Sequence, residues 1–155
     1  SKYSPTEFWV GAKYYQGTRS PNNAEREDIG YSSAWLHHKG RNKHHYEDWI
    51  DYSMQALPGG MAPVPMPDKY IAEMIMDRIA ASKVYMGDEY TDRSPLDYYY
   101  QGTDRAPIHP ETKAKLLYVL EMLAEEGEEK TFRFIKEELV QHKRCMDWHQ
   151  LEKAE

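Results

Sequence analysis

Start and stop signals for helices recur along most of this sequence. The segment 4–7 reads Ser-Pro-Thr-Glu, which combines a capping Ser, a Pro suited to the first helical position and a Glu three residues after the cap. Ser94-Pro95 repeats the signal, and Pro110 opens another stretch. Glycines that tolerate the left-handed conformation beyond a helix end follow these and neighbouring stretches: Gly17, Gly87, Gly102 and Gly127. Because no segment shows the alternation typical of a strand, the sequence predicts an all-α fold with about six helices.

The length of 155 residues is sufficient for one domain with its own core. We therefore expect a compact single-domain bundle over residues 1–155, with a long helix over 68–86. Residues 55–67 hold four Pro and two Gly, which predicts a loop, either a lid or an ordinary surface connection. A polar C-terminal helix is expected over 128–155.

Composition narrows the classes of function. The formal net charge of −6 disfavours a dedicated nucleic-acid-binding protein, which usually carries a basic surface. No apolar run reaches the roughly 18 residues of a membrane-spanning helix, so no membrane partner is expected. With Cys145 as the only cysteine, disulfides within the chain are excluded and a cytoplasmic location is expected. A small-molecule or protein partner, including a second copy of the chain, fits this composition better.

The most unusual stretch is rich in histidine. Four of the seven histidines fall between positions 37 and 45: His37, His38, His44 and His45. Gly40 and Asn42 predict a turn between the two pairs, which would let the imidazoles converge. Imidazole is the commonest protein ligand for divalent transition metals such as Mn, Fe, Ni, Co or Zn. The alternative is a solvated, mildly basic turn, because Lys39, Arg41 and Lys43 are interspersed with the histidines.

Two carboxylates in the long helix form a second candidate group. Glu73 and Asp77 lie four positions apart on a helix that is apolar around most of its circumference, which predicts a buried helix. A buried carboxylate is usually paired, hydrogen-bonded or bound to a metal. A histidine-held metal would suit these acids, and the alternative is a buried ion pair with one of three cations: Arg26, Arg41 or Lys83.

The motifs together resemble a known family. The segments that carry the resemblance are SKYSPTEFW, YYQGTRSPN, AWLHHKGRNKHHYEDW, MPDKYIAEMIMDRIAASKVY, YTDRSPLDYYYQG and IHPET. They resemble a bacterial and phage family that is classed only as a domain of unknown function. In that family a His-Asp-Leu-Ser-Lys motif ends at the position of Ser1-Lys2. This motif, the later histidines and a final Asp look like the HD superfamily of metal-dependent phosphohydrolases.

The HD-like resemblance assigns roles to individual residues. It implies that Asp77 is the last metal ligand and that His38, His44 and His45 are further ligands or face a phosphate. Catalytic roles would fall to His44, His45 and Lys2, with His37 as an additional metal ligand. Asn42 would orient one histidine, and substrate contacts would come from Arg41, Asn42 and Glu73. The implied substrate is a nucleotide or another small phosphate ester.

This chain begins after the His-Asp pair of the family motif. We therefore expect either a trimmed hydrolase or a site that is completed differently. Three interpretations remain open from the sequence. The first is a metal-dependent phosphohydrolase. The second is a non-catalytic helical module for binding or assembly, with an incomplete metal site. The third is a purely structural role, in which the histidines and carboxylates of a truncated protein pair with one another.

Overall fold

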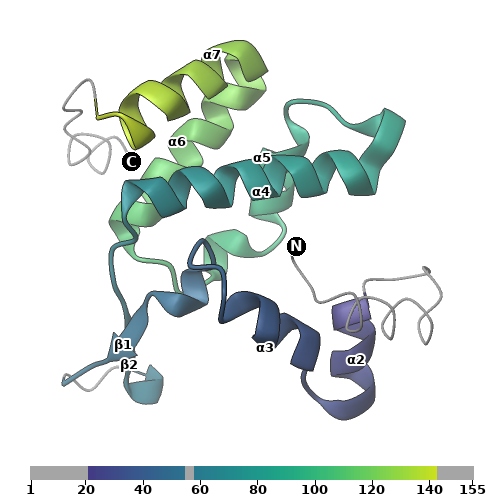
Figure 1. Cartoon of the computed structure of the whole chain (residues 1–155), viewed down its shortest axis with the longest axis vertical. Helices are drawn as coiled ribbons and strands as arrows, with labels where there is room; N and C mark the ends of the chain where they lie inside the picture. Colours follow the sequence, from purple (N-terminus) through teal and green to yellow (C-terminus); the bar gives the residue numbers. More distant parts are fainter. Residues whose placement is uncertain (1–20, 55–57, 143–155) are drawn as a thin grey trace. The chain divides into compact units, whose positions relative to one another are not determined.

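The computed structural model describes residues 21–54 and 58–142, and its contacts divide the chain into an N-terminal unit, Ser1–Asp48, and a C-terminal unit, Trp49–Glu155. Helices dominate the described residues of both units (Figure 1), so the prediction of an all-α fold is confirmed. A single domain over the whole chain stays a prediction. The helix expected to begin at Ser4 lies outside the described residues.

The N-terminal unit is built around a short helix pair. Its described helices are α2 (Pro21–Ile29), α3 (Ser33–Lys39) and the 3-10 helix η1 (Tyr46–Asp48). Gly30 separates α2 from α3 with a φ of 89°, which only glycine adopts readily. Ser32 caps α3 by accepting from the backbone N–H of Trp35 at 3.1 Å, and its hydroxyl donates to Asn22 of α2 at 3.3 Å. These contacts fix the start of the helix that carries the first two histidines.

Glu25 connects α2 to the first turn of α3. Its carboxylate accepts a hydrogen bond from the Ser33 hydroxyl at 2.7 Å. Partial burial by itself raises the pKa of Glu25, but the nearby Ser32 and Ser33 hydroxyls and backbone N–H groups together lower it below its ordinary value. The positive end of the short helix favours the same charged form of Glu25.

A small hairpin opens the C-terminal unit and corrects the expectation that the chain has no strand. Strand β1 (Ile50–Tyr52) pairs antiparallel with β2 (Met61–Pro63), and Ile50 lies opposite Pro63. The expected loop 55–67 thus contains a strand. Three-residue strands are too short to show an alternating pattern, and the 3-10 turn η2 (Pro58–Gly60) reverses the chain through two glycines with positive φ. Of that loop, residues 55–57 lie outside the described residues.

The other helices of the C-terminal unit follow the sequence signals closely. The α-helices are α4 (Asp68–Met86), α5 (Ser94–Tyr100), α6 (Pro110–Glu126) and α7 (Glu128–Phe134), followed by a π-helix (Ile135–Val140). Short 3-10 helices lie at Gly87–Glu89 and Thr103–Arg105. Gly87 and Gly127 end α4 and α6 with φ values of 52° and 81°. The expected C-terminal helix begins at Glu128, as predicted, but residues 143–155 lie outside the described part.

The core of this unit lies between α4, α6 and the π-helix, with α5 and α7 also packed on α6 (Figure 1). Its fully buried side chains include Ile71, Ile75, Leu116, Val119, Leu120, Leu123 and Leu139. The prediction that α4 is buried around most of its circumference is wrong. Only one face is buried, while Glu73 and Ala80 are exposed and Val84 keeps 80% of its surface accessible. None of the described helices is both long and apolar enough to cross a membrane.

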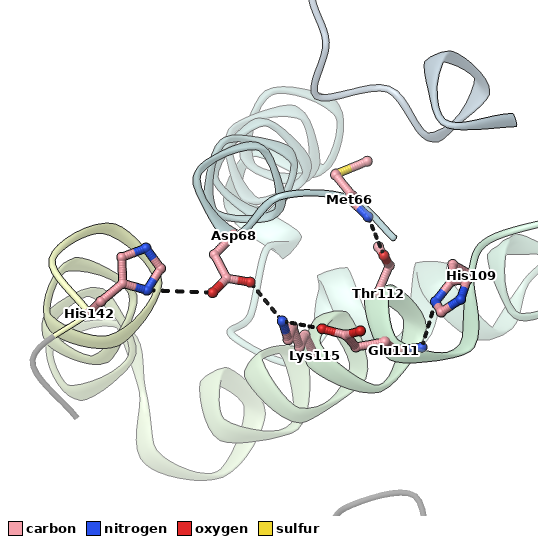
Figure 2. Close-up of polar contacts among 7 residues, drawn as sticks. All are labelled: Met66, Asp68, His109, Glu111, Thr112, Lys115 and His142. Atoms are coloured by element: carbon pink, nitrogen blue, oxygen red, sulfur yellow. Dashed lines mark hydrogen bonds and ion pairs between the residues drawn. The ribbon is translucent and has the colours of Figure 1, made fainter. Parts of the chain in front are cut away.

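A polar network ties the starts of α4 and α6 together, as Figure 2 shows. The buried Lys115 ammonium donates to Asp68 and to Glu111, each at 2.8 Å. Burial alone would lower the pKa of Lys115, but its hydrogen bonds and charge interactions with the two carboxylates raise it overall. His142, just after the π-helix, lies 3.6 Å from the other carboxylate oxygen of Asp68. The buried Thr112 hydroxyl accepts from the Met66 backbone N–H at 2.9 Å.

Candidate metal centre

A series of turns after α3 brings His44 and His45 back toward the end of that helix. Gly40 closes α3 by donating to the Leu36 carbonyl at 3.0 Å. Two turns follow, in which the N–H of Arg41 bonds to the His38 carbonyl and the N–H of Asn42 bonds to the Lys39 carbonyl, each at 3.1 Å. The turn predicted at Gly40 and Asn42 is therefore confirmed.

Three imidazoles converge in this N-terminal unit. Each of His38, His44 and His45 offers one ligand atom, and these atoms all lie within 4.8 Å of one another. His38 is 1% exposed and His44 is 5% exposed, so the group is largely shielded from water. The Nε2 atoms of His38 and His45 are 2.8 Å apart. The rings of His44 and His45 are also close, with centroids 4.3 Å apart.

The separations suit a transition metal after a small adjustment. A tetrahedral ion with metal–nitrogen bonds of about 2.0–2.1 Å holds its ligand nitrogens about 3.3 Å apart. On metal binding, the Nε2 atoms of His38 and His45, now 2.8 Å apart, would therefore move slightly apart. Ligand atoms that are as much as 4.8 Å apart would move closer together. Three imidazole ligands leave at least one coordination position for water or substrate, as in catalytic rather than structural zinc sites. The donor set therefore fits Zn²⁺ and its first-row neighbours.

Asn42 contacts the buried His38 in two places. Its side-chain amide nitrogen lies 3.0 Å from His38 Nδ1 and 2.6 Å from the His38 backbone oxygen. The side chain that the sequence assigned to orienting a histidine thus does contact one.

The ring of Trp35 packs against two of the histidines. This contact was not predicted from the sequence. The Trp35 ring lies 5.5 Å from the ring of His38 and 4.7 Å from that of His45, measured between centroids. The Arg26 guanidinium lies 5.5 Å from the centroid of the Trp35 ring. The signal was present, because Trp35 precedes His38 by three positions and therefore lies on the same helix face.

The remaining predicted residues fall into three groups. His37 is half-buried on α3 but is not a member of the three-histidine group, and Arg41 is exposed in the turn. Glu73 and Asp77 belong to the C-terminal unit, where Glu73 is exposed and Asp77 is half-buried, so the expected burial of Glu73 is wrong. A metal-binding role for Asp77 stays a prediction. Lys2 lies outside the described residues.

The comparison with family models decides where this chain belongs. A family model matches residues 1–122, which include the histidine segment and all of α4. The chain belongs to a family of unknown function, DUF5662. The DUF5662 match confirms the resemblance to a domain of unknown function and ends within α6. Neither the curated proteins nor the solved structures contain a match.

Proposed function

We propose that this DUF5662 chain binds a divalent transition metal through His38, His44 and His45, and that the site serves the hydrolysis of a phosphate ester. The convergence of the three imidazoles within 4.8 Å carries the proposal. Three neighbouring imidazoles with no carboxylate or thiolate among them match the ligand preferences of Zn, Co, Ni and Fe. When bound, such a metal supplies a Lewis acid that polarises a phosphoryl oxygen and acidifies water.

The local charge supports an anionic substrate. Lys39, Arg41 and Lys43 lie in the turn, and no Asp or Glu occurs between positions 29 and 46 of a chain whose formal net charge is −6. Arg41 is exposed, so its guanidinium can reach a phosphate group and bind it through two parallel hydrogen bonds. We assign substrate binding to Arg41.

A non-catalytic metal site is the second candidate, and one observation favours it. His38 and His44 are both almost fully buried, which restricts the room for a substrate beside the metal. A metal held there would tie the end of α3 to the turn that precedes η1. It would stabilise the N-terminal unit by binding the folded chain in preference to the unfolded chain.

The two candidates predict different effects of the same variants. Untagged protein should retain stoichiometric metal by elemental analysis, and His44→Ala should lose it, while His142→Ala serves as the matched control outside the group. For a hydrolase, Arg41→Gln should lower turnover of nitrophenyl phosphate or a nucleotide and leave the metal content unchanged. Metal-dependent thermal stabilisation without hydrolysis of any phosphate ester in a broad panel would favour the structural site. Absence of metal binding would contradict both.

A further inference from the structure

The Asn42 side chain has a defined orientation beside His38. Its amide nitrogen lies 2.6 Å from the His38 backbone oxygen. A carbonyl oxygen only accepts hydrogen bonds, so the atom that faces it is the NH₂ group and not the amide oxygen. The second hydrogen of that NH₂ group points to His38 Nδ1 at 3.0 Å. Asn42 is therefore a donor to the imidazole.

This donor selects one tautomer of His38. Because Nδ1 accepts from Asn42, it carries no proton, and a neutral His38 carries its proton on Nε2. That N–H then donates to Nε2 of His45 at 2.8 Å. Hydrogen bonds thus run in one direction, from Asn42 to His38 and from His38 to His45.

The same tautomer opposes a metal at His38. A metal ligand needs an unprotonated nitrogen with an available lone pair. At Nδ1 the lone pair accepts from Asn42, and at Nε2 a proton is in the way. Coordination through Nε2 would move the proton to Nδ1, where it would face the NH₂ group of Asn42. Whichever nitrogen binds, the Asn42 amide must turn or move away.

We propose that Asn42 is a positioning residue that sets the metal affinity of the site through the tautomer of His38. This inference rests on the proposed metal binding. In the metal-bound state the amide turns so that its oxygen accepts from His38 Nδ1–H, the arrangement that commonly orients a ligating histidine. The His38 backbone oxygen keeps a second donor after this turn, the N–H of Arg41 at 3.1 Å. The cost of turning the amide makes metal binding weaker and more reversible than three imidazoles alone would give.

Three variants test this role by titration with Zn²⁺ against a chromophoric chelator. Asn42→Asp offers only acceptors to Nδ1–H and should bind Zn²⁺ about tenfold more tightly than the wild type, within the range seen for groups that orient metal ligands. Asn42→Leu removes the donor without adding an acceptor, so its affinity should lie between the two. Arg41→Gln is the control for charge, since it changes the net charge by the same one unit in the same turn. Equal tightening by Asn42→Asp and Arg41→Gln would overturn the proposal.

A spectroscopic measurement separates this inference from the proposed function. In chelator-treated, ¹⁵N-labelled protein, two-dimensional imidazole spectra should show His38 protonated on Nε2 in the wild type and on Nδ1 in Asn42→Asp. Protonation of wild-type His38 on Nδ1 would overturn the inference whether or not the protein binds metal. Zn²⁺ binding by Asn42→Asp but not by the wild type would support the role of Asn42 and contradict metal binding as the native function. Absence of Zn²⁺ binding by all variants would contradict both the proposed function and the effect of Asn42 on metal affinity, whatever tautomer His38 adopts.

Discussion

His38 Nε2 and His45 Nε2 lie 2.8 Å apart, although the two residues are seven positions apart and only the first belongs to α3. In a continuous helix, residues seven apart lie nearly two turns from each other along the axis, about 10 Å at 1.5 Å per residue. The turn at Gly40 and Asn42 removes that separation. The pair therefore depends on the helix ending at Lys39, and it is the most specific feature of the candidate site.

Trp35 should report metal binding by its fluorescence. Its ring lies 4.7 Å from the ring of His45, which is within the short range over which a bound paramagnetic ion quenches an indole. Titration with Cu²⁺ should quench the wild type saturably. Trp35→Phe should bind with similar affinity but show a smaller quenched fraction, and His44→Ala should lose the saturable phase. Equal quenching in the wild type and Trp35→Phe would contradict this placement of Trp35.

Helices and their ends could be predicted from the sequence because their signals are local. Pro110 and Gly127 bound α6 as predicted, and Gly87 ends α4. The β1–β2 hairpin could not be predicted, because its strands have three residues each and depend on pairing across a turn. The exposure of Glu73 was missed for a related reason. Side-chain type shows that a helix is apolar, whereas burial depends on which neighbours cover each face.

The candidate site, like the fold, could be predicted from the sequence only in part. The spacing of the histidines and the turn residues predicted convergence, but not which three imidazoles converge or that His37 is excluded from the group. That choice depends on the φ and ψ angles of the turn, which residue types constrain only weakly. For Asn42, the sequence predicted only that the side chain orients a histidine. That this histidine is His38, and that the Asn42 amide donates to it, follows from the structure.

Lys115 should be one of the most sensitive polar positions in the C-terminal unit. Its side chain is 6% exposed and holds the carboxylates of Asp68 and Glu111. Lys115→Met keeps the aliphatic stem but removes the ammonium that donates to both carboxylates, so we expect a loss of about 3 kcal/mol in the free energy of unfolding. Lys130→Met, which removes an exposed ion pair with Glu126, should cost no more than about 1 kcal/mol in urea titrations. Equal effects would contradict the network in Figure 2.

The same network predicts a dependence of stability on alkaline pH. The folded-state pKa of Lys115 is raised above its ordinary 10.5, so the folded chain binds this proton more tightly than the unfolded chain. The resulting stabilisation is complete below the unfolded pKa and is lost as pH rises through the folded pKa. The difference in unfolding free energy between the wild type and Lys115→Met should therefore be constant near neutrality and shrink above pH 10.5. A difference that grows with pH would contradict the sign of the shift.

Thr112 should matter because its hydroxyl satisfies a buried backbone donor. The Met66 N–H donates to Thr112 Oγ1 at 2.9 Å, and both residues are buried. Thr112→Val keeps the shape of the side chain but removes the acceptor, so the unfolding free energy should fall by about 1–3 kcal/mol. Thr112→Ser retains the hydroxyl and should cost less. A larger loss for Thr112→Ser would show that packing of the methyl group outweighs the hydrogen bond.

The most direct test of the proposed metal centre is the metal content of untagged protein after equilibration with Zn²⁺ and gel filtration. The account predicts one Zn²⁺ per chain in the wild type and in His142→Ala, and a loss of stoichiometric metal in His38→Ala, His44→Ala and His45→Ala. A folded wild type that retains no metal, or three variants that retain as much as the wild type, would contradict it.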